Sequence, residues 1–171
     1  MAYQEDPTLD LRFKLVVLII LCFVVERVFS LLVILQAAYL VPALSMLLSQ
    51  GCAGGTYNEL QSPEVVIVAP TRELAIQIHK ESTKFSHNSV LRSCLVYGGT
   101  NVQHQVGKVQ AGCNIVVATV GRLKDMVGRG RLDFSGVKFF ILDEADRMLD
   151  MGFGGDIEWF ACHPTMPPVV S

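Results

Sequence analysis

Short apolar runs rich in β-branched residues alternate with amphipathic segments between residues 65 and 142. The runs predict strands at Val65–Ala69, Val90–Tyr97, Cys113–Thr119 and Val137–Leu142. The segments between them predict helices from Pro70-Thr71 to about Phe85, over Val102–Gln110 and over Gly121–Val127. Because strands and helices alternate, the connections should be right-handed crossovers within a mostly parallel sheet. The sequence therefore predicts an α/β fold whose sheet is flanked by helices.

A hydrophobic leader precedes this pattern. Eleven apolar residues, Leu15–Val25, are followed by Glu26-Arg27 and a second apolar run to Leu35. The first run is shorter than the roughly 20 residues of a spanning helix, and one span over both runs would place two charges near its middle. Neighbouring acids and the lack of a small-x-small cleavage site argue against a signal peptide. A membrane anchor is the less favoured alternative to a helical leader that is foreign to the following domain.

The bulk composition fits one domain of 171 residues. With a net charge of −2, the chain has no overall basic character, so nucleic-acid binding would need a local basic face. The five cysteines are odd in number and form no C-x-x-C pair. Neither a disulfide framework nor a metal cluster is predicted, which favours a reducing, cytoplasmic compartment. The four histidines have no ligand spacing and receive no chemical role.

Polar or glycine-containing clusters follow the predicted strand ends. They are Pro70-Thr71-Arg72-Glu73, Gly98-Gly99-Thr100, Thr119-Val120-Gly121-Arg122 and Asp143-Glu144-Ala145-Asp146. The carboxyl ends of parallel strands meet at one edge, where such folds bind ligands. Acids there can hold hydrated Mg²⁺ and position an attacking water. The alternative for the acids is an ordinary acidic first turn of a helix, which suits the helix dipole.

The other three clusters are suited to phosphate groups. A hydroxyl, a glycine or an arginine at a helix start can bind the backbone of a nucleic acid without reading its bases. Lys124, Arg129 and Arg131 would extend this basic face. Plain helix caps, a tight turn and a solvated helix surface are the alternatives that these residues leave open.

Four motifs carry a resemblance to a known family. They are APTRELA (Ala69–Ala75), YGGT (Tyr97–Thr100), VATVGRL (Val117–Leu123) and LDEADRMLDMGF (Leu142–Phe153). Residues 37–168 resemble the first RecA-like lobe of a DEAD-box ATP-dependent RNA helicase, and the wider wording is most similar to the Vasa-like branch. The resemblance divides the chain into a leader over 1–36, a partial ATP-binding lobe over 37–168 and a tail over 169–171.

The resemblance implies roles for individual residues. Asp143, through water, and Glu144 would bind Mg²⁺ and orient the water that hydrolyses ATP, and Asp146 would link this catalytic site to a later motif. RNA-backbone contacts would come from Pro70, Thr71, Arg72, Gly98, Gly99, Thr119, Gly121 and Arg122. The implied cofactors are ATP and Mg²⁺, and the implied partners are RNA and the protein partners of the parent helicase. A Vasa-like member would be cytoplasmic and found in perinuclear granules.

The chain also departs from the family pattern. A glycine-rich phosphate loop ending in Gly-Lys-Thr should directly precede Ala37, but residues 31–36 read Leu-Leu-Val-Ile-Leu-Gln. The upstream adenine-reading glutamine motif is not recognisable, and Val120 replaces the usual proline. The chain ends before the Ser-Ala-Thr motif and the second lobe. We therefore expect a leader that substitutes for the normal beginning, and no independent ATPase activity.

Three functional classes follow from the resemblance and the departures. The first is an ATP-dependent RNA helicase lobe. The second is a non-catalytic half-domain that binds RNA or a partner. The third is a membrane-tethered or unstable splice product.

Overall fold

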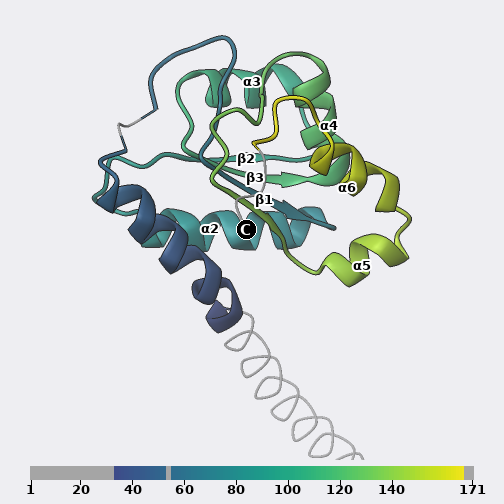
Figure 1. The fold of residues 1–171 in the computed structure, drawn as a ribbon, viewed down its shortest axis with the longest axis horizontal. Coiled ribbons are helices and arrows are strands. Elements are labelled where there is room, and N and C mark those ends of the chain that lie inside the picture. The colour runs from purple at the N-terminus through teal and green to yellow at the C-terminus, as the bar shows by residue number, and fades with distance from the viewer. Residues whose placement is uncertain (1–32, 53–54, 168–171) are drawn as a thin grey trace, which may run out of the picture. The chain divides into compact units, whose positions relative to one another are not determined.

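The computed structural model describes residues 33–52 and 55–167, and its centre is a parallel sheet. The strands are β1 (Val65–Ala69), β2 (Ser93–Val96), β3 (Ile115–Thr119) and β4 (Phe139–Leu142). They lie in the order β2-β3-β1-β4, and every pairing is parallel (Figure 1). The helices between and after them are α2 (Arg72–Phe85), α3 (Val102–Gln110), α4 (Val120–Gly128), α5 (Ala145–Asp150) and α6 (Gly154–Ala161). The predicted α/β class, a parallel sheet flanked by helices, is confirmed.

The sequence placed three strand starts too early, while β1 matches its predicted range. The predicted second strand began at Val90, but β2 begins at Ser93 because Asn88, at φ 61°, and a Ser89 side-chain bond to the Leu91 amide form a turn. The predicted third strand began at Cys113, but β3 begins at Ile115. The predicted fourth strand began at Val137, whose amide instead closes a turn on the Phe134 carbonyl.

Alternate strand residues supply two hydrophobic cores, one on each face of the sheet. Val65, Ile67 and Ala69 of β1 pack with α2, while Val66 and Val68 face the opposite core. This second core receives residues of α3, α4, α5 and α6, and α3, α4 and α6 lie on that side of the sheet in Figure 1. Because β1 and β3 are almost completely buried on both faces, their sequences are continuous apolar runs rather than alternating ones.

A helix over residues 33–49 precedes the sheet. The chain divides into two compact units, Met1–Ala38 and Tyr39–Ser171. Within the second unit, Leu40, Ala43, Leu44 and Leu47 of this helix are buried in the same core as α2. Of the predicted leader over 1–36, only residues 33–36 lie inside the described ranges. Within those ranges, no helix combines the length and apolar composition that a membrane span requires.

Candidate functional site at the carboxyl edge of the sheet

The strand order places the four predicted clusters along one edge of the sheet. Val96 pairs with Ala118, Ala69 with Thr119, and Val68 with Leu142, so all strands end at the same level. The clusters therefore follow one another in the order of β2, β3, β1 and β4. We call the first three the basic end, consisting of Pro70, Thr71, Arg72, Tyr97, Gly98, Gly99, Thr100, Thr119, Gly121 and Arg122. The acidic end consists of Asp143, Glu144 and Asp146.

Arg72 joins the clusters after β1 and β2. Thr71 is the N-cap of α2, and its hydroxyl accepts a hydrogen bond from the Leu74 amide at 3.3 Å. Arg72 follows directly, and its guanidinium lies 4.5 Å from the centre of the Tyr97 ring. This cation–π contact fixes the stem of the arginine. Among the described residues Arg72 forms no ion pair.

The buried side chain of Gln105 holds the loop after β2. Its Oε1 accepts from the Tyr97 amide at 3.1 Å, and its Nε2 donates to the Tyr97 carbonyl at 3.0 Å and to the Thr100 hydroxyl. Between these contacts Gly98 and Gly99 are exposed, and Gly99 has φ 80°. A Cβ atom at either glycine would meet nothing within 4 Å, so this stretch of backbone is open to a ligand. The sequence analysis did not single out Gln105. The only indication of its role is that a polar residue falls on the buried face of α3.

Arg122 joins the clusters after β3 and β2. Its Nη2 donates to the Thr100 carbonyl at 3.5 Å. Its Nη1 is buried and has no hydrogen-bond acceptor among the described residues. Thr119, the N-cap of α4, makes no side-chain cap bond, so its hydroxyl is also unused by the helix. A buried cationic donor without an acceptor is costly unless a ligand supplies one.

Two of the three residues predicted to extend the basic end, Lys124 and Arg129, are compensated by acids. Lys124 Nζ lies 2.5 Å from an Asp156 oxygen, and Arg129 Nε lies 2.6 Å from an Asp125 oxygen. The Lys124 ammonium and the Arg129 guanidinium are therefore each paired with a carboxylate at the surface. This arrangement matches the solvated helix surface that the sequence left as the alternative.

Asp143 is held at the end of β4 by two contacts. Its amide donates to the Val68 carbonyl at 3.0 Å, which continues the pairing with β1. Its Oδ2 accepts a 2.9 Å hydrogen bond from the hydroxyl of Tyr39. Burial raises the pKa of Asp143; the Tyr39 bond opposes this shift and the neighbouring Glu144 adds to it. Burial and the carboxylate together raise the pKa of Tyr39, so its hydroxyl remains a donor. Tyr39 was not among the predicted site residues.

Glu144 has a strained backbone. It is the N-cap of α5 with φ 54° and ψ 50°, a left-handed conformation that a residue with a Cβ rarely adopts. Its carboxylate accepts a 3.0 Å bond from Arg147 Nη1. Asp146 lies exposed in the first turn of α5. Backbone strain of this kind is concentrated at functional sites, where surrounding structure maintains it.

The acidic end offers oxygen ligands that suit a hydrated magnesium ion, whereas residues 31–36 do not offer the groups that suit a nucleoside triphosphate. Asp143 and Glu144 are oxygen donors next to each other, and Mg²⁺ commonly binds one or two carboxylates while keeping several waters. Among the described residues no group of three His, Cys, Asp or Glu side chains could hold a metal directly. A phosphate loop holds a triphosphate with glycine amides and a lysine, and residues 31–36 contain neither residue type.

Comparisons with known proteins agree with the predicted resemblance. Residues 37–168 match the model of the family described as "DEAD/DEAH box helicase". The chain is 47% identical over 132 residues to a probable ATP-dependent RNA helicase vasa-like of Penaeus vannamei, and 50% identical over 132 residues to the ATP-dependent RNA helicase vasa of Drosophila melanogaster. Each match covers 77% of this chain and 19% of the relative, so the chain spans about a fifth of their length.

Solved structures give the same result. The yeast DEAD-box splicing factor Prp28 matches with a TM-score of 0.66 and 32% identity, over 72% of this chain and 28% of that one. A hypothetical ATP-dependent RNA helicase from Sulfolobus tokodaii matches with a TM-score of 0.62 and 32% identity, over 77% of this chain and 35% of that one. The resemblance to a RecA-like lobe of the Vasa-like branch is confirmed. The chain belongs to the DEAD/DEAH box helicase family.

Proposed function

We propose that this chain binds the backbone of single-stranded RNA at the basic end and a hydrated Mg²⁺ at the acidic end, without hydrolysing ATP by itself. In this proposal Arg72 and Arg122 bind phosphates, and the open backbone at Gly98-Gly99 lies along the strand. Asp143, through water, and Glu144 hold the ion. Asp146 would connect to a segment outside this lobe.

The observation that carries the RNA proposal is the buried Nη1 of Arg122, which lacks an acceptor among the described residues. A phosphate oxygen would supply that acceptor by a charge-assisted bond. The contacts from Arg72 to Tyr97 and from Arg122 to Thr100 support one continuous surface. None of these groups reads a base edge, so binding is expected to depend on the backbone and to be largely independent of sequence.

The RNA proposal is tested by fluorescence anisotropy with a labelled uridine oligonucleotide. We expect weak binding whose affinity falls as salt rises, because phosphate contacts release counterions. Arg122→Ala and Arg72→Ala should each weaken binding by about tenfold, the order expected for losing one charge-assisted bond. Arg147→Ala is the matched control, since this exposed arginine pairs with Glu144 away from the basic end. Unchanged affinity in both Arg72→Ala and Arg122→Ala would exclude the basic end as the RNA site.

The absence of ATP hydrolysis is tested by phosphate release from the same protein with ATP, Mg²⁺ and RNA. We expect no turnover above background, because positioning and electrostatic stabilisation of the γ-phosphate supply most of the catalysis in this class. Turnover that disappears in Glu144→Gln would show that the chain is an ATPase on its own. That result would favour the helicase alternative.

A further inference from the structure

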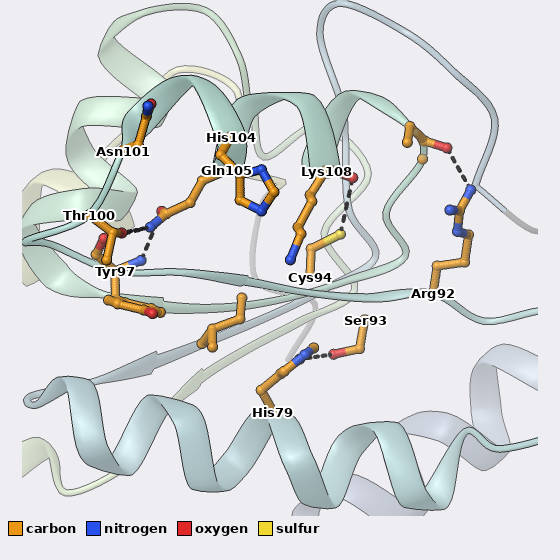
Figure 2. Close-up of a pocket in the computed structure, with 13 residues that line it drawn as sticks. His79, Arg92, Ser93, Cys94, Tyr97, Thr100, Asn101, His104, Gln105 and Lys108 are labelled. Carbon is orange, nitrogen blue, oxygen red and sulfur yellow. Dashed lines mark hydrogen bonds between the residues drawn. The ribbon is translucent and has the colours of Figure 1, made fainter.

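A groove runs along the free edge of β2, between α2 and α3 (Figure 2). Its volume is about 830 Å³. In Figure 2 His79 extends from α2 on one side of the strand, and His104 and Lys108 extend from α3 on the other. Within the part of the chain that the structure describes, β2 is the last strand of the sheet on this side.

The free edge of β2 directs backbone groups into the groove. The Arg92 carbonyl accepts from the Ile115 amide at 3.1 Å, so even-numbered residues of this strand face β3. In a ladder the amide and carbonyl of one residue point to the same side, and successive residues alternate. Ser93, Leu95 and Tyr97 therefore face outwards. Gln105 satisfies both backbone groups of Tyr97. Those of Ser93 and Leu95 have no partner within residues 33–52 and 55–167, so we infer that they are available for an added strand.

The groove has a positive character that the chain as a whole lacks. Its lining residues include two cations, Arg92 and Lys108, and no aspartate or glutamate is among them. Arg92 is positioned by a 2.6 Å bond from Nη1 to the Ala111 carbonyl. Among the described residues neither Arg92 nor Lys108 belongs to an ion pair. Burial and the charge of Lys108, which extends from α3 in Figure 2, lower the pKa of His79.

We propose that this groove binds an extended acidic peptide segment, which adds as a strand to β2 at Ser93 and Leu95 and places carboxylates near Lys108 and Arg92. The pattern of groups favours a peptide over a nucleic acid. A strand edge offers amides and carbonyls in alternation, and a peptide backbone matches both. A phosphate backbone carries hydrogen-bond acceptors. These would face the outward carbonyls of β2, which are also acceptors, and no hydrogen bond would form. This inference concerns a surface separate from the basic end and does not depend on RNA binding there.

The proposal is tested by fluorescence anisotropy with the full chain. The probe is a fluorescein-labelled peptide in which Glu alternates with Val and Thr, and the comparison peptide has Gln in place of each Glu. We expect the acidic peptide to bind at least about tenfold more tightly, as complementary charge across an interface favours association. Lys108→Glu should reduce acidic-peptide affinity by about tenfold or more. Lys80→Glu makes the same charge change on the exposed side of α2, outside the groove, and should leave binding unchanged.

Amide hydrogen exchange separates strand addition from charge attraction alone. The acidic peptide should slow the exchange of the Ser93 and Leu95 amides, while the amides of the basic end keep their rates. Lys108→Gln serves as a second variant if Lys108→Glu fails to fold by circular dichroism. Equal affinity for the two peptides, or no protection at Ser93 and Leu95, would overturn the proposal. A uridine oligonucleotide that protects these amides while the peptide does not would assign the groove to RNA and would also overturn it.

Discussion

The basic end and the acidic end of the same sheet edge are held in different ways. At the basic end, side chains from several elements contact one another: Arg72 of α2 stacks on Tyr97, Gln105 of α3 brackets the loop, and Arg122 of α4 reaches Thr100. At the acidic end, the side chain of Asp143 accepts one hydrogen bond, from a tyrosine 104 residues earlier in the chain. Glu144 keeps a left-handed backbone.

The two ends therefore depend on different parts of the chain. The side-chain contacts described at the basic end join residues between 71 and 122. The acidic end depends on Tyr39 in the helix over residues 33–49. The first residues of this helix belong to the segment 31–36, which contains no glycine and no lysine. We therefore expect the proposed binding of a phosphate backbone at the basic end to be independent of the acidic end.

The largest effect is expected from a substitution that weakens the sheet, on which both ends depend. Ile67 lies completely buried in the middle of β1, which pairs with β3 and β4. Ile67→Ala should lower the free energy of unfolding by about 3 kcal/mol, through lost burial and a cavity that cannot collapse between two neighbouring strands. Urea denaturation followed by circular dichroism measures this. Val90→Ala is the control, because Val90 is 56% exposed and its truncation should change stability by less than about 0.5 kcal/mol.

If Ile67→Ala destabilised the protein no more than this control, the sheet would not be the common support of the two ends. The basic end and the acidic end would then belong to regions that fold independently.

A smaller effect is expected at the acidic end alone. Tyr39→Phe removes the hydroxyl that donates to Asp143 and should lower the free energy of unfolding by about 1 kcal/mol near neutral pH, a typical value for one hydrogen bond. Affinity of the basic end for RNA should remain unchanged. Equal losses of RNA affinity in Tyr39→Phe and Arg122→Ala would contradict the separation of the two ends.

The pH dependence of this effect has a definite sign. Burial leaves the pKa of Asp143 above its ordinary value of 3.8, so the folded protein binds this proton more readily than the unfolded chain does. The carboxyl group by itself therefore stabilises the fold increasingly as the pH falls through its folded-state pKa. The Tyr39 bond opposes the shift because it favours the ionised form. The difference between wild type and Tyr39→Phe should thus be largest near neutral pH and shrink as the pH approaches 3.8, which denaturation at several pH values will measure.

The parts of the fold that follow from local signals were predicted from the sequence. The carboxyl ends of β1, β3 and β4 fall where predicted, because each apolar run ends there, before Pro70, at Thr119 and before Asp143 respectively. Thr71 was predicted as a helix cap, and α3 has its predicted bounds. These features depend on neighbours in sequence, and so their residue types are informative.

Contacts between distant segments left no such signal. The hydroxyl of Tyr39 and the amide of Gln105 act on groups that the fold brings to them, and a tyrosine or glutamine on a helix is ordinary by itself. The left-handed conformation of Glu144 was also not predicted, because glutamate has no local preference for it. The predicted roles of the acids and of the RNA-binding residues stay predictions that the experiments described here test.

A further prediction isolates the backbone strain of the acidic end. Glu144→Gly and Glu144→Ala remove the same carboxylate and the same pairing with Arg147, so they differ mainly in the freedom of the backbone. At φ 54° the glycine variant should be more stable than the alanine variant by about 1 kcal/mol, because only glycine adopts this conformation without a steric penalty. Chemical denaturation of the pair gives the difference. Equal stabilities would mean that Glu144 carries no strain and that the two ends do not differ in this respect.

The smallest effect is expected on the outer surface of α4, where the basic end was predicted to continue. Arg129 pairs with Asp125 one turn earlier, and both side chains are partly exposed, so Arg129→Ala should change the free energy of unfolding by less than about 0.5 kcal/mol. Because this guanidinium already has a carboxylate partner, RNA affinity should change far less than in Arg122→Ala, whose Nη1 has no acceptor among the described residues. Anisotropy titrations of the two variants at the same salt concentration compare them directly. Equal losses of RNA affinity in the two variants would extend the RNA site along α4. Arg129 would then contribute as much as Arg122, although it must leave its ion pair with Asp125 to bind phosphate.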